Sequence, residues 1–475
     1  MSESGRTIDE INGDNPSQIP EDLMHFIRRD TYSLLVKGFA GTGKTTLALT
    51  ILSALGVKDN FFYISTRISP SQLFQYYPWL KNFVGESNPK GSRLARERLV
   101  MPSFEDARLD EPESLFERIT NQLMDSKSPI IIIDSWDAIA SFMDREARLN
   151  NERVLQTWSE RAGAKLIFIS EQPADATLDF LVDGIVELKQ SYYNNVKIRQ
   201  IFLRKLRGTR INRSSYLYTL ENSIFHSFSP YKPIRFKPYK RSSANFSKPS
   251  MDDSIPSGYP MLDAALGSGF PRKSLILLEL DSRVDMTIAM IFLEKIVRNF
   301  LLSGNPVILQ PVNWIKPSSL LRFFEVSPPA SKKSLFRILW TGKADMKSTQ
   351  IISQGKNQSS DQLLAAFAKM KERHPDKLLL NIMWTEAIQS LFSAKKVRSG
   401  MKSILSRIMV HADLSIAVLT PSQQDLLELV SEVSNIRLRL VMINDTLFLQ
   451  PLLPPSNLYS VIFDGGSEMR LKPVL

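Results

Sequence analysis

The run Gly38–Thr46 constrains this chain more than any other, because it fits the phosphate-binding loop pattern G-x-x-x-x-G-K-[ST]. Residues 33–37 before it predict a buried strand, and residues 46–52 after it predict a helix. The alternative is a chance glycine-rich turn, which the flanking strand and helix argue against. The loop in this context predicts that the chain binds a nucleotide.

Each residue type in the run has a physical reason. Glycines let the backbone bring its N–H groups close to phosphate oxygens, and the helix start adds the positive end of a dipole. Lys44 is expected to reach the β- and γ-phosphates of ATP, and the Thr45 hydroxyl to ligate Mg²⁺. The predicted nucleotide-binding residues are Gly38, Gly41, Thr42, Gly43, Lys44, Thr45 and Thr46.

The rest of the first half alternates strands with helices. Further strands are predicted at 61–65, 130–133, 165–170 and 183–188, and a helix at 146–161. This alternation is typical of an α/β domain with a mostly parallel sheet, in which ligands bind at the carboxyl ends of strands. Lys44, Asp134 and Ser170 all fall at such ends.

Asp134 is the predicted second metal ligand. It follows the apolar run 130–133, which is typical of a central strand buried on both faces. Its carboxylate is expected to hold Mg²⁺ opposite Thr45, and the alternative is that it only caps the following loop. Lys44 and Asp134 are therefore the first two candidate catalytic residues.

The order of these segments carries a family resemblance. The phosphate-binding loop, the strand ending at Asp134, Asp183-Gly184 and then Lys205-Leu206-Arg207-Gly208-Thr209 resemble the RecA/KaiC-like ATPases. The resemblance implies that Lys205 and Arg207 stabilise charge on the nucleotide of a neighbouring subunit, and hence a homo-oligomer. The alternative is that residues 198–209 form a solvated basic strand at the edge of a hairpin.

One position departs from that family. The strand after the first helix of KaiC-like proteins typically ends in a catalytic glutamate, but here it ends Ser65-Thr66-Arg67, and arginine cannot accept a proton. Glu171 is the nearest alternative carboxylate, so we expect hydrolysis to be slow or partner-dependent. This stretch, Pro78-Trp79-Leu80 and the layout of the chain resemble the archaeal gas-vesicle regulators, the GvpD-like proteins.

The amino-acid composition limits which sites and partners the chain can have. The chain has no cysteine and four scattered histidines, so we expect no disulfides and no metal site besides Mg²⁺ with the nucleotide. Residues 1–19 are expected to be a disordered tail without a signal peptide, and no run is long enough for a membrane span. A reducing, cytoplasmic location is expected. The net charge of +11 permits nucleic-acid binding.

Residues 229–252 predict a basic linker between domains at 20–228 and 253–475. Its cations alternate with aromatic residues and prolines. The alternatives are a solvated tether, a nucleic-acid contact with stacked aromatics, or docking on a neighbouring subunit. The basic residues are Lys232, Arg235, Lys237, Lys240, Arg241 and Lys248, and the aromatic residues are Phe228, Tyr231, Phe236, Tyr239 and Phe246.

The second half predicts a degenerate copy of the first. Residues 258–271 resemble the start of a KaiC-like domain, and Ser274–Thr287 align without gaps on Ser33–Thr46. Met383 aligns with Asp134, so both halves of the site are lost. The alternative is an unrelated α/β domain. The alignment sets Glu279, Ser282, Val284, Asp285 and Met286 against Gly38, Gly41, Gly43, Lys44 and Thr45.

These observations lead to two alternative hypotheses about the function. The first is an ATP-dependent regulatory switch that hydrolyses ATP slowly in the first domain and controls a protein partner. The second is a DNA-associated RecA paralogue of recombination or repair, favoured by the basic linker. A fast ATPase motor is disfavoured by residues 65–67.

Overall fold

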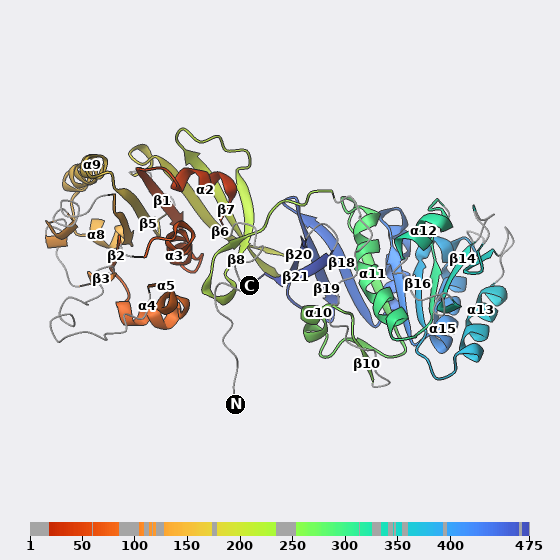
Figure 1. Cartoon of the computed structure of the whole chain (residues 1–475). Helices are drawn as coiled ribbons and strands as arrows, with labels where there is room; N and C mark the ends of the chain where they lie inside the picture. The colour runs from red at the N-terminus through yellow and green to blue at the C-terminus, as the bar shows by residue number, and fades with distance from the viewer. Residues whose placement is uncertain are drawn as a thin grey trace, which may run out of the picture. The chain divides into compact units, whose positions relative to one another are not determined.

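The chain divides into two compact units, Met1–Ser229 with Val474–Leu475 and Pro230–Pro473 (Figure 1). No helix among the described residues is long and apolar enough to cross a membrane. The computed structural model describes residues 19–58, 60–84, 104–108, 114–115, 117–119, 128–172, 178–233, 253–312, 314–324, 334–340, 345, 348–353, 360–392, 397–464 and 468–474.

The first unit is built on a sheet whose strands run in the order β3-β2-β4-β5-β1-β6-β7-β8-β9. The strands from β3 to β6 pair in parallel, and β7, β8 and β9 continue the sheet in antiparallel fashion. The strands are β1 Tyr32–Gly38, β2 Phe61–Ser65, β3 Phe104–Asp106, β4 Ile130–Asp134, β5 Lys165–Ser170, β6 Gly184–Tyr193, β7 Val196–Leu206, β8 Ser215–Thr219 and β9 His226–Ser227. The helices are α2 Glu21–Ile27, α3 Lys44–Leu55, α4 Pro70–Tyr76, α5 Trp79–Val84, α8 Trp136–Ala140 and α9 Arg145–Ala162.

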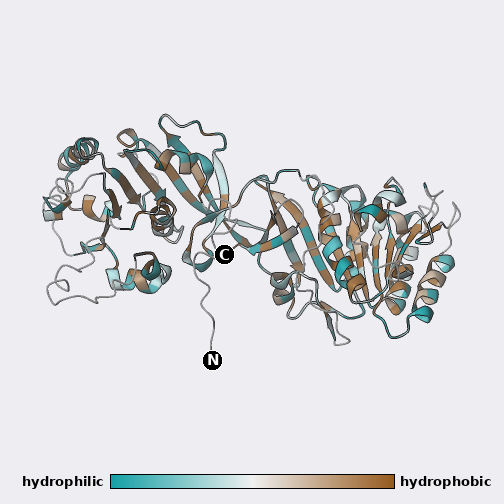
Figure 2. Cartoon of the chain, viewed as in Figure 1, coloured by the Kyte–Doolittle hydropathy of each residue, from teal (hydrophilic) through white to brown (hydrophobic). Residues whose placement is uncertain are grey.

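Strand β1 is at the centre of this unit because every one of its side chains is buried. Successive residues point to opposite faces, so Leu34 and Val36 join the hydrophobic core on the α3 side while Leu35 joins the core beneath α8 and α9. Figure 2 shows the hydrophobic residues concentrated along the central strands of each unit. The mixed α/β fold with a mostly parallel sheet is confirmed. Ile19, which the tail prediction included, is buried in the first of these cores.

The expectation that residues 198–209 lie at the sheet edge is wrong. Strand β7 pairs with β6 on one side and with β8 on the other, and β9 lies beyond β8. The reason is the segment Ser215–Thr219, whose residues pair with Arg199–Phe202 and cover the outer side of β7. The hairpin itself, from β6 into β7, is as expected.

The second unit has a sheet in the order β15-β14-β13-β16-β17-β12-β18-β19-β20-β21. From β14 to β21 this repeats the order of the first sheet strand for strand, with β12 in the place of β1. The strands are β10 Ser254–Ile255, β11 Phe270–Pro271, β12 Ser274–Leu280, β13 Val307–Gln310, β14 Phe336–Trp340, β15 Ile351–Ser353, β16 Leu380–Trp384, β17 Leu414–Leu419, β18 Ile436–Ile443, β19 Thr446–Leu453, β20 Tyr459–Asp464 and β21 Glu468–Pro473. The helices are α10 Pro260–Ala265, α11 Met286–Leu302, α12 Pro317–Phe323, α13 Ser360–Arg373, α14 Thr385–Gln389, α15 Val397–His411 and α16 Leu427–Val433.

The two faces of this second sheet are covered by different helices. Ile276 and Leu278 pack in the core that includes α11, whereas Leu275 and Leu277 pack in the core formed with α13 and α15. The turn between β18 and β19 is formed by Asn444 and Asp445, whose φ of 46° and 54° are typical of a two-residue hairpin turn.

A buried charge lies at the same place in both central strands. Lys37 of β1 forms an ion pair with Asp179 at 2.5 Å. Glu279 of β12 is 2% exposed and pairs with two arginines of β18, Arg437 at 2.8 Å and Arg439 at 2.7 Å. The sign of the buried charge is therefore opposite in the two sheets.

Candidate functional site

The loop between β1 and α3 has a backbone that only glycine adopts readily. Gly41 and Gly43 have φ of 77° and 88°, and Gly43 is the N-cap of α3. A Cβ atom on Gly43 would also lie 2.7 Å from the Cδ1 atom of Leu220. Both conformation and space thus require glycine here, and the loop places its backbone at the start of a helix, where anions bind.

Thr42 holds the loop in shape. Its side chain is buried, and its hydroxyl donates a hydrogen bond to the Phe39 carbonyl at 2.8 Å. The Thr42 carbonyl accepts a hydrogen bond at 2.5 Å from the hydroxyl of Tyr218 on β8. The antiparallel extension of the sheet therefore supports the loop from the side, which the sequence did not indicate.

Lys44 is almost completely enclosed, with 6% of its surface exposed. Its ammonium group donates to the Phe39 carbonyl at 3.0 Å and lies 3.9 Å from the Glu171 carboxylate. Burial lowers the pKa of Lys44, while the negative charges of Glu171 and Asp134 partly oppose that shift. A buried ammonium at a helix start is suited to a phosphate group, whose charge would compensate the desolvation.

Thr45 and Asp134 meet although far apart in sequence. The Thr45 hydroxyl donates to Asp134 Oδ2 at 2.6 Å, and the hydroxyl of Tyr63 on β2 donates to the same oxygen. Burial raises the pKa of Asp134, and the hydrogen bonds from Thr45 and Tyr63 counteract part of the rise. The carboxylate faces Thr45, not the loop after it. A carboxylate beside a hydroxyl supplies the oxygen ligands that Mg²⁺ prefers, so these residues fit the metal.

Two tyrosines of this site were missed by the sequence reasoning. Tyr63 contacts Asp134, and the Tyr77 hydroxyl lies 3.1 Å from the Thr46 hydroxyl. Burial raises the pKa of both phenols. The sequence could have indicated Tyr63, because it lies in a mostly apolar strand predicted to be buried, and the hydroxyl of a buried tyrosine needs a hydrogen-bond partner.

Glu171 lies at the tip of β5, and Arg67 holds it. An Arg67 guanidinium nitrogen is 2.5 Å from Glu171 Oε2, and the Asp137 carboxylate accepts the backbone N–H of Glu171 at 2.5 Å. Thr66 bonds to backbone instead, since its hydroxyl donates to the Asp134 carbonyl at 3.1 Å and accepts from the Ser135 N–H at 2.8 Å. None of residues 65–67 has a carboxylate, and the nearby carboxylate of Glu171 forms an ion pair with Arg67.

Residues 23–207 match the family model described as GvpD gas vesicle protein, P-loop domain. The chain resembles the GvpD P-loop proteins. It is 23% identical over 315 residues to Protein GvpD2 of Halobacterium salinarum, which covers 62% of this chain and 61% of that protein. Protein GvpD1 of the same organism is 25% identical over 306 residues, covering 59% of this chain and 54% of that protein.

The circadian clock oscillator protein KaiC of Rippkaea orientalis is 25% identical over 267 residues, covering 51% of this chain and 47% of that protein. The alignments to the GvpD and KaiC proteins thus span about half to three fifths of the length of these relatives. The matches to both groups agree with a P-loop fold in the first unit.

Lys205 and Arg207 are not brought to the loop of their own GvpD-like unit. Leu206, between them, pairs with Gly184, which pairs in turn with Leu34 near the start of β1, whereas the loop follows the end of that strand. Lys205 donates to the carbonyls of Asp179 and Val182 at 2.8 and 2.6 Å. Arg207 is 53% exposed and lies 3.4 Å from Asp183.

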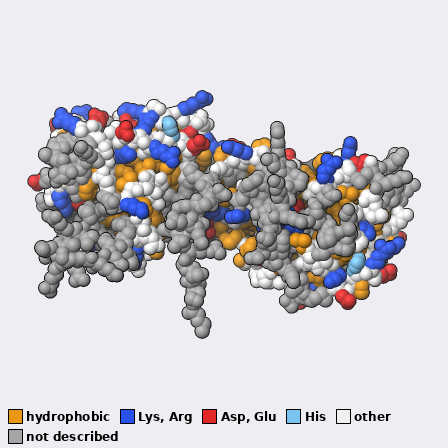
Figure 3. Space-filling view, in the orientation of Figure 1, with side chains coloured by type: hydrophobic (Ala, Val, Ile, Leu, Met, Phe, Trp, Pro, Cys, Tyr) orange, Lys and Arg blue, Asp and Glu red, His pale blue; other side chains and the backbone are white. Residues whose placement is uncertain are grey.

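The basic linker is largely outside the described residues, which include Lys232 but not Arg235, Lys237, Lys240, Arg241 or Lys248. Two of its aromatic residues are engaged in packing. Phe228 is buried, and the Tyr231 N–H donates to the Asp445 carbonyl at 2.7 Å while its ring lies 6.2 Å from that of Phe463. Phe228 is therefore not available to stack on bases, and Tyr231 is half-buried. On the face drawn in Figure 3, the described basic and acidic side chains are interspersed.

The structure corrects the alignment of the second unit by one residue. Strand β12 begins at Ser274 where β1 begins at Tyr32, and it pairs with β17 and β18 as β1 pairs with β5 and β6. The turn bond from Thr42 N–H to Phe39 O has its counterpart from Val284 to Asp281. The corrected alignment sets Leu280, Arg283, Asp285, Met286 and Thr287 against Gly38, Gly41, Gly43, Lys44 and Thr45, and Glu279 against Lys37.

The corrected pairs keep a threonine, Thr287, at the position of Thr45 but lack the lysine and the left-handed glycine of the first loop. Met286 replaces the ammonium of Lys44, and Asp285 caps α11 with φ of −67° in place of the left-handed Gly43. By strand pairing Trp384, not Met383, stands at the position of Asp134. The Trp384 indole N–H donates a hydrogen bond to the Met286 sulfur at 3.1 Å, so these two side chains contact each other where the first unit has Asp134 and Lys44.

Proposed function

We propose that the first unit binds ATP with Mg²⁺ and that the protein is a regulatory switch, with a second unit that is a tandem copy unable to bind nucleotide. The observation that carries the proposal is the hydrogen bond of 2.6 Å between Thr45 and Asp134, beside the buried ammonium of Lys44. A hydroxyl, a carboxylate and a cation therefore lie together at the start of α3. The likeness to GvpD and KaiC proteins supports the same conclusion.

The residues have distinct tasks in this proposal. The backbone N–H groups of residues 39–43 and the start of α3 would hold the β-phosphate, and Lys44 would neutralise the terminal phosphate. Thr45 and Asp134 would hold Mg²⁺, which supplies positive charge between the phosphate oxygens. Regulation requires that two states of the protein bind ATP with different affinity.

Metal dependence tests the site directly. Titration of a fluorescent ATP analogue should show binding with Mg²⁺ that weakens when EDTA removes the metal. Thr45→Ala should weaken binding about tenfold with Mg²⁺, because one charge-assisted ligand is lost, and should change little in EDTA. Thr157→Ala, on the exposed surface of α9, is the matched control. Absence of analogue binding, or equal binding with and without metal, would contradict the proposal.

Hydrolysis is proposed to be slow because Arg67 pairs with Glu171, the carboxylate that lies 3.9 Å from the Lys44 ammonium and is the candidate base. Arg67→Ala should free Glu171 to accept a proton from water and raise basal turnover about tenfold, a modest part of what general-base catalysis contributes. Adding Glu171→Gln should cancel the rise, and Arg108→Ala, which breaks an exposed pair with Asp106, should have no effect. Steady-state phosphate release measures all four proteins. Unchanged turnover in Arg67→Ala would exclude Glu171 as a restrained base.

Lys205 and Arg207 are proposed to act on the nucleotide of a neighbouring copy, since they lie at the other end of β1 from their own loop. The exposed guanidinium of Arg207 has long contacts, 3.4 Å to Asp183 and 3.3 Å to the Phe180 carbonyl, that it would exchange for the neighbouring nucleotide. Turnover per subunit should rise with protein concentration in the wild type and stay low in Arg207→Ala, while Arg204→Ala, which loses a surface pair with Glu187, should behave as the wild type. A concentration-independent rate that Arg207→Ala does not alter would refute a role in trans.

A further inference from the structure

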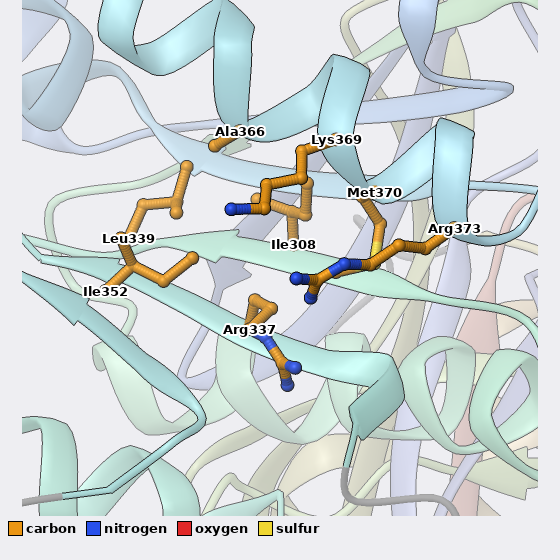
Figure 4. A pocket seen from close by; sticks show the side chains of 8 residues that line it. All are labelled: Ile308, Arg337, Leu339, Ile352, Ala366, Lys369, Met370 and Arg373. Atoms are coloured by element: carbon orange, nitrogen blue, oxygen red, sulfur yellow. The ribbon is translucent and has the colours of Figure 1, made fainter.

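A cavity in the second unit lies far from any predicted site. Figure 4 shows it between α13 and the face of strands β13, β14 and β15. It has a volume of about 320 Å³ including its open mouth. The residues that line it are Ile308, Arg337, Leu339, Ile352, Ala366, Lys369, Met370 and Arg373.

The cavity has an apolar base. Ile308 and Leu339 belong to the core on this side of the sheet, and Ile352 pairs with Leu339 across neighbouring strands. On the helix, residues 366, 369, 370 and 373 are spaced by three and four positions, so they share the face that covers the strands. The cavity is thus built by regular elements.

Three cations surround this apolar base. In Figure 4, Lys369 and Arg373 extend from α13, and the guanidinium of Arg337 lies below that of Arg373. Among the residues that the structure describes, no acidic side chain lines the cavity, and Lys369 and Arg373 form no ion pair. Glu372, three residues after Lys369 on α13, does not line the cavity.

The Arg337 guanidinium is half-buried within this cluster. Burial lowers its pKa, and the positive charge of Arg373 lowers it further. The pKa of the adjacent His374 is also lowered, first by burial and then by the positive charges of Arg373 and Arg337. The positive charges of Arg373 and Arg337 are thus close enough to repel each other, and an anion bound beside them would relieve that repulsion.

We propose that this cavity is a binding site for a phosphate monoester that carries an apolar or aromatic group. Three cations match a dianion better than a carboxylate, and guanidinium groups bind phosphate oxygens in pairs. The apolar residues below would receive the organic part. The cavity is small and open to solvent, which limits the ligand to a compact one.

This site is separate from the loop of the second unit. Arg337 and Ile308 are each the second residue of their strands, near the amino ends of β14 and β13. The loop 281–285 follows the carboxyl end of β12. Occupancy of the cavity consequently does not depend on the phosphate-binding chemistry that this unit lacks.

Phenyl phosphate is the probe that tests the proposal. Isothermal titration calorimetry of the full chain, with a saturating ATP analogue and Mg²⁺ to occupy the first unit, should detect binding of phenyl phosphate. Arg373→Gln and Lys369→Gln should each weaken it about tenfold, because each removes a charge-assisted contact from an exposed position. Benzoate should bind more weakly than phenyl phosphate, and inorganic phosphate should lose the apolar contribution.

Arg398→Gln is the matched control, since Arg398 is an exposed arginine of the same unit that pairs with Glu428. It should bind phenyl phosphate as the wild type does. Absence of binding at millimolar probe, or equal affinity in Arg373→Gln, Lys369→Gln and Arg398→Gln, would overturn the proposal. Binding that disappears when the ATP analogue is added would assign the probe to the first unit and overturn it as well.

Discussion

Replacing Lys44 by alanine is expected to weaken ATP binding about a hundredfold while leaving the first unit folded. The ammonium would lose its contact with a phosphate group, and a hydrogen-bonded charge pair in a buried setting contributes enough for this factor. The fold should tolerate the change because a desolvated cation is removed. Glu171 keeps its ion pair with Arg67, so no carboxylate is left without a partner.

Equilibrium titration with a fluorescent ATP analogue measures this loss, and circular dichroism monitors the fold. Lys58→Ala is the matched control, because Lys58 is an exposed lysine after the end of α3. Under the proposed regulatory function, a protein partner should be retained by the wild type with ATP and released by Lys44→Ala. Equal affinity of the Lys44→Ala variant and the wild type would remove the basis for a nucleotide site in this loop.

Replacing Glu279 by alanine should destabilise the second unit by about 3–5 kcal/mol. The carboxylate is buried and pairs with Arg437 and Arg439, so its loss leaves two partly buried guanidinium groups uncompensated. Glu279→Gln should have a smaller effect because the amide oxygen still accepts hydrogen bonds from one arginine.

Hydrogen exchange of the full chain localises this effect. Peptides from β12 and β18 should exchange faster in Glu279→Ala, and peptides from β1 and β6 should not change. Glu432→Ala removes an exposed pair with Lys402 and should leave exchange in both units unaltered. If β12 and β18 keep their protection in Glu279→Ala, the three charges contribute little to the fold.

The sequence predicted the α/β class and the strand–loop–helix unit because the loop needs glycines, a lysine and a hydroxyl at fixed spacing. The apolar run before Asp134 was equally informative, since few segments other than a central strand are so uniformly apolar. The meeting of Thr45 with Asp134 followed from the rule that ligands bind at the carboxyl ends of parallel strands.

Strand register was harder to predict. The sequence alignment matched Ser274 with Ser33 because both halves carry serine and threonine at similar spacing, and it missed the register by one residue. A shift of one residue exchanges the two faces of a strand, and only the pairing with β17 and β18 reveals which residue faces which core. The counterpart of Lys44 is accordingly Met286, not Asp285.

Contacts between strand tips were also beyond the sequence. Arg67 follows β2 and Glu171 follows β5, and their ion pair depends on the order in which β2, β4 and β5 lie in the sheet. The same holds for Tyr63 and Asp134 on neighbouring strands. The prediction of an edge strand at 198–209 was wrong because β8 pairs with the outer side of β7. That pairing depends on the path of the loop between β7 and β8, and the alternation of polar and apolar residues in β7 carries no information about that path.

The opposite signs of Lys37 and Glu279 bear on how one chain folds two sheets with the same strand order. Strand β1 inserted into the second sheet would bring Lys37 against Arg437 and Arg439, and strand β12 inserted into the first would bring Glu279 against Asp179 and Glu187. Like charges in a buried setting repel strongly. The charge on each central strand is therefore compatible only with its own sheet. This disfavours exchange of strands between the two halves during folding.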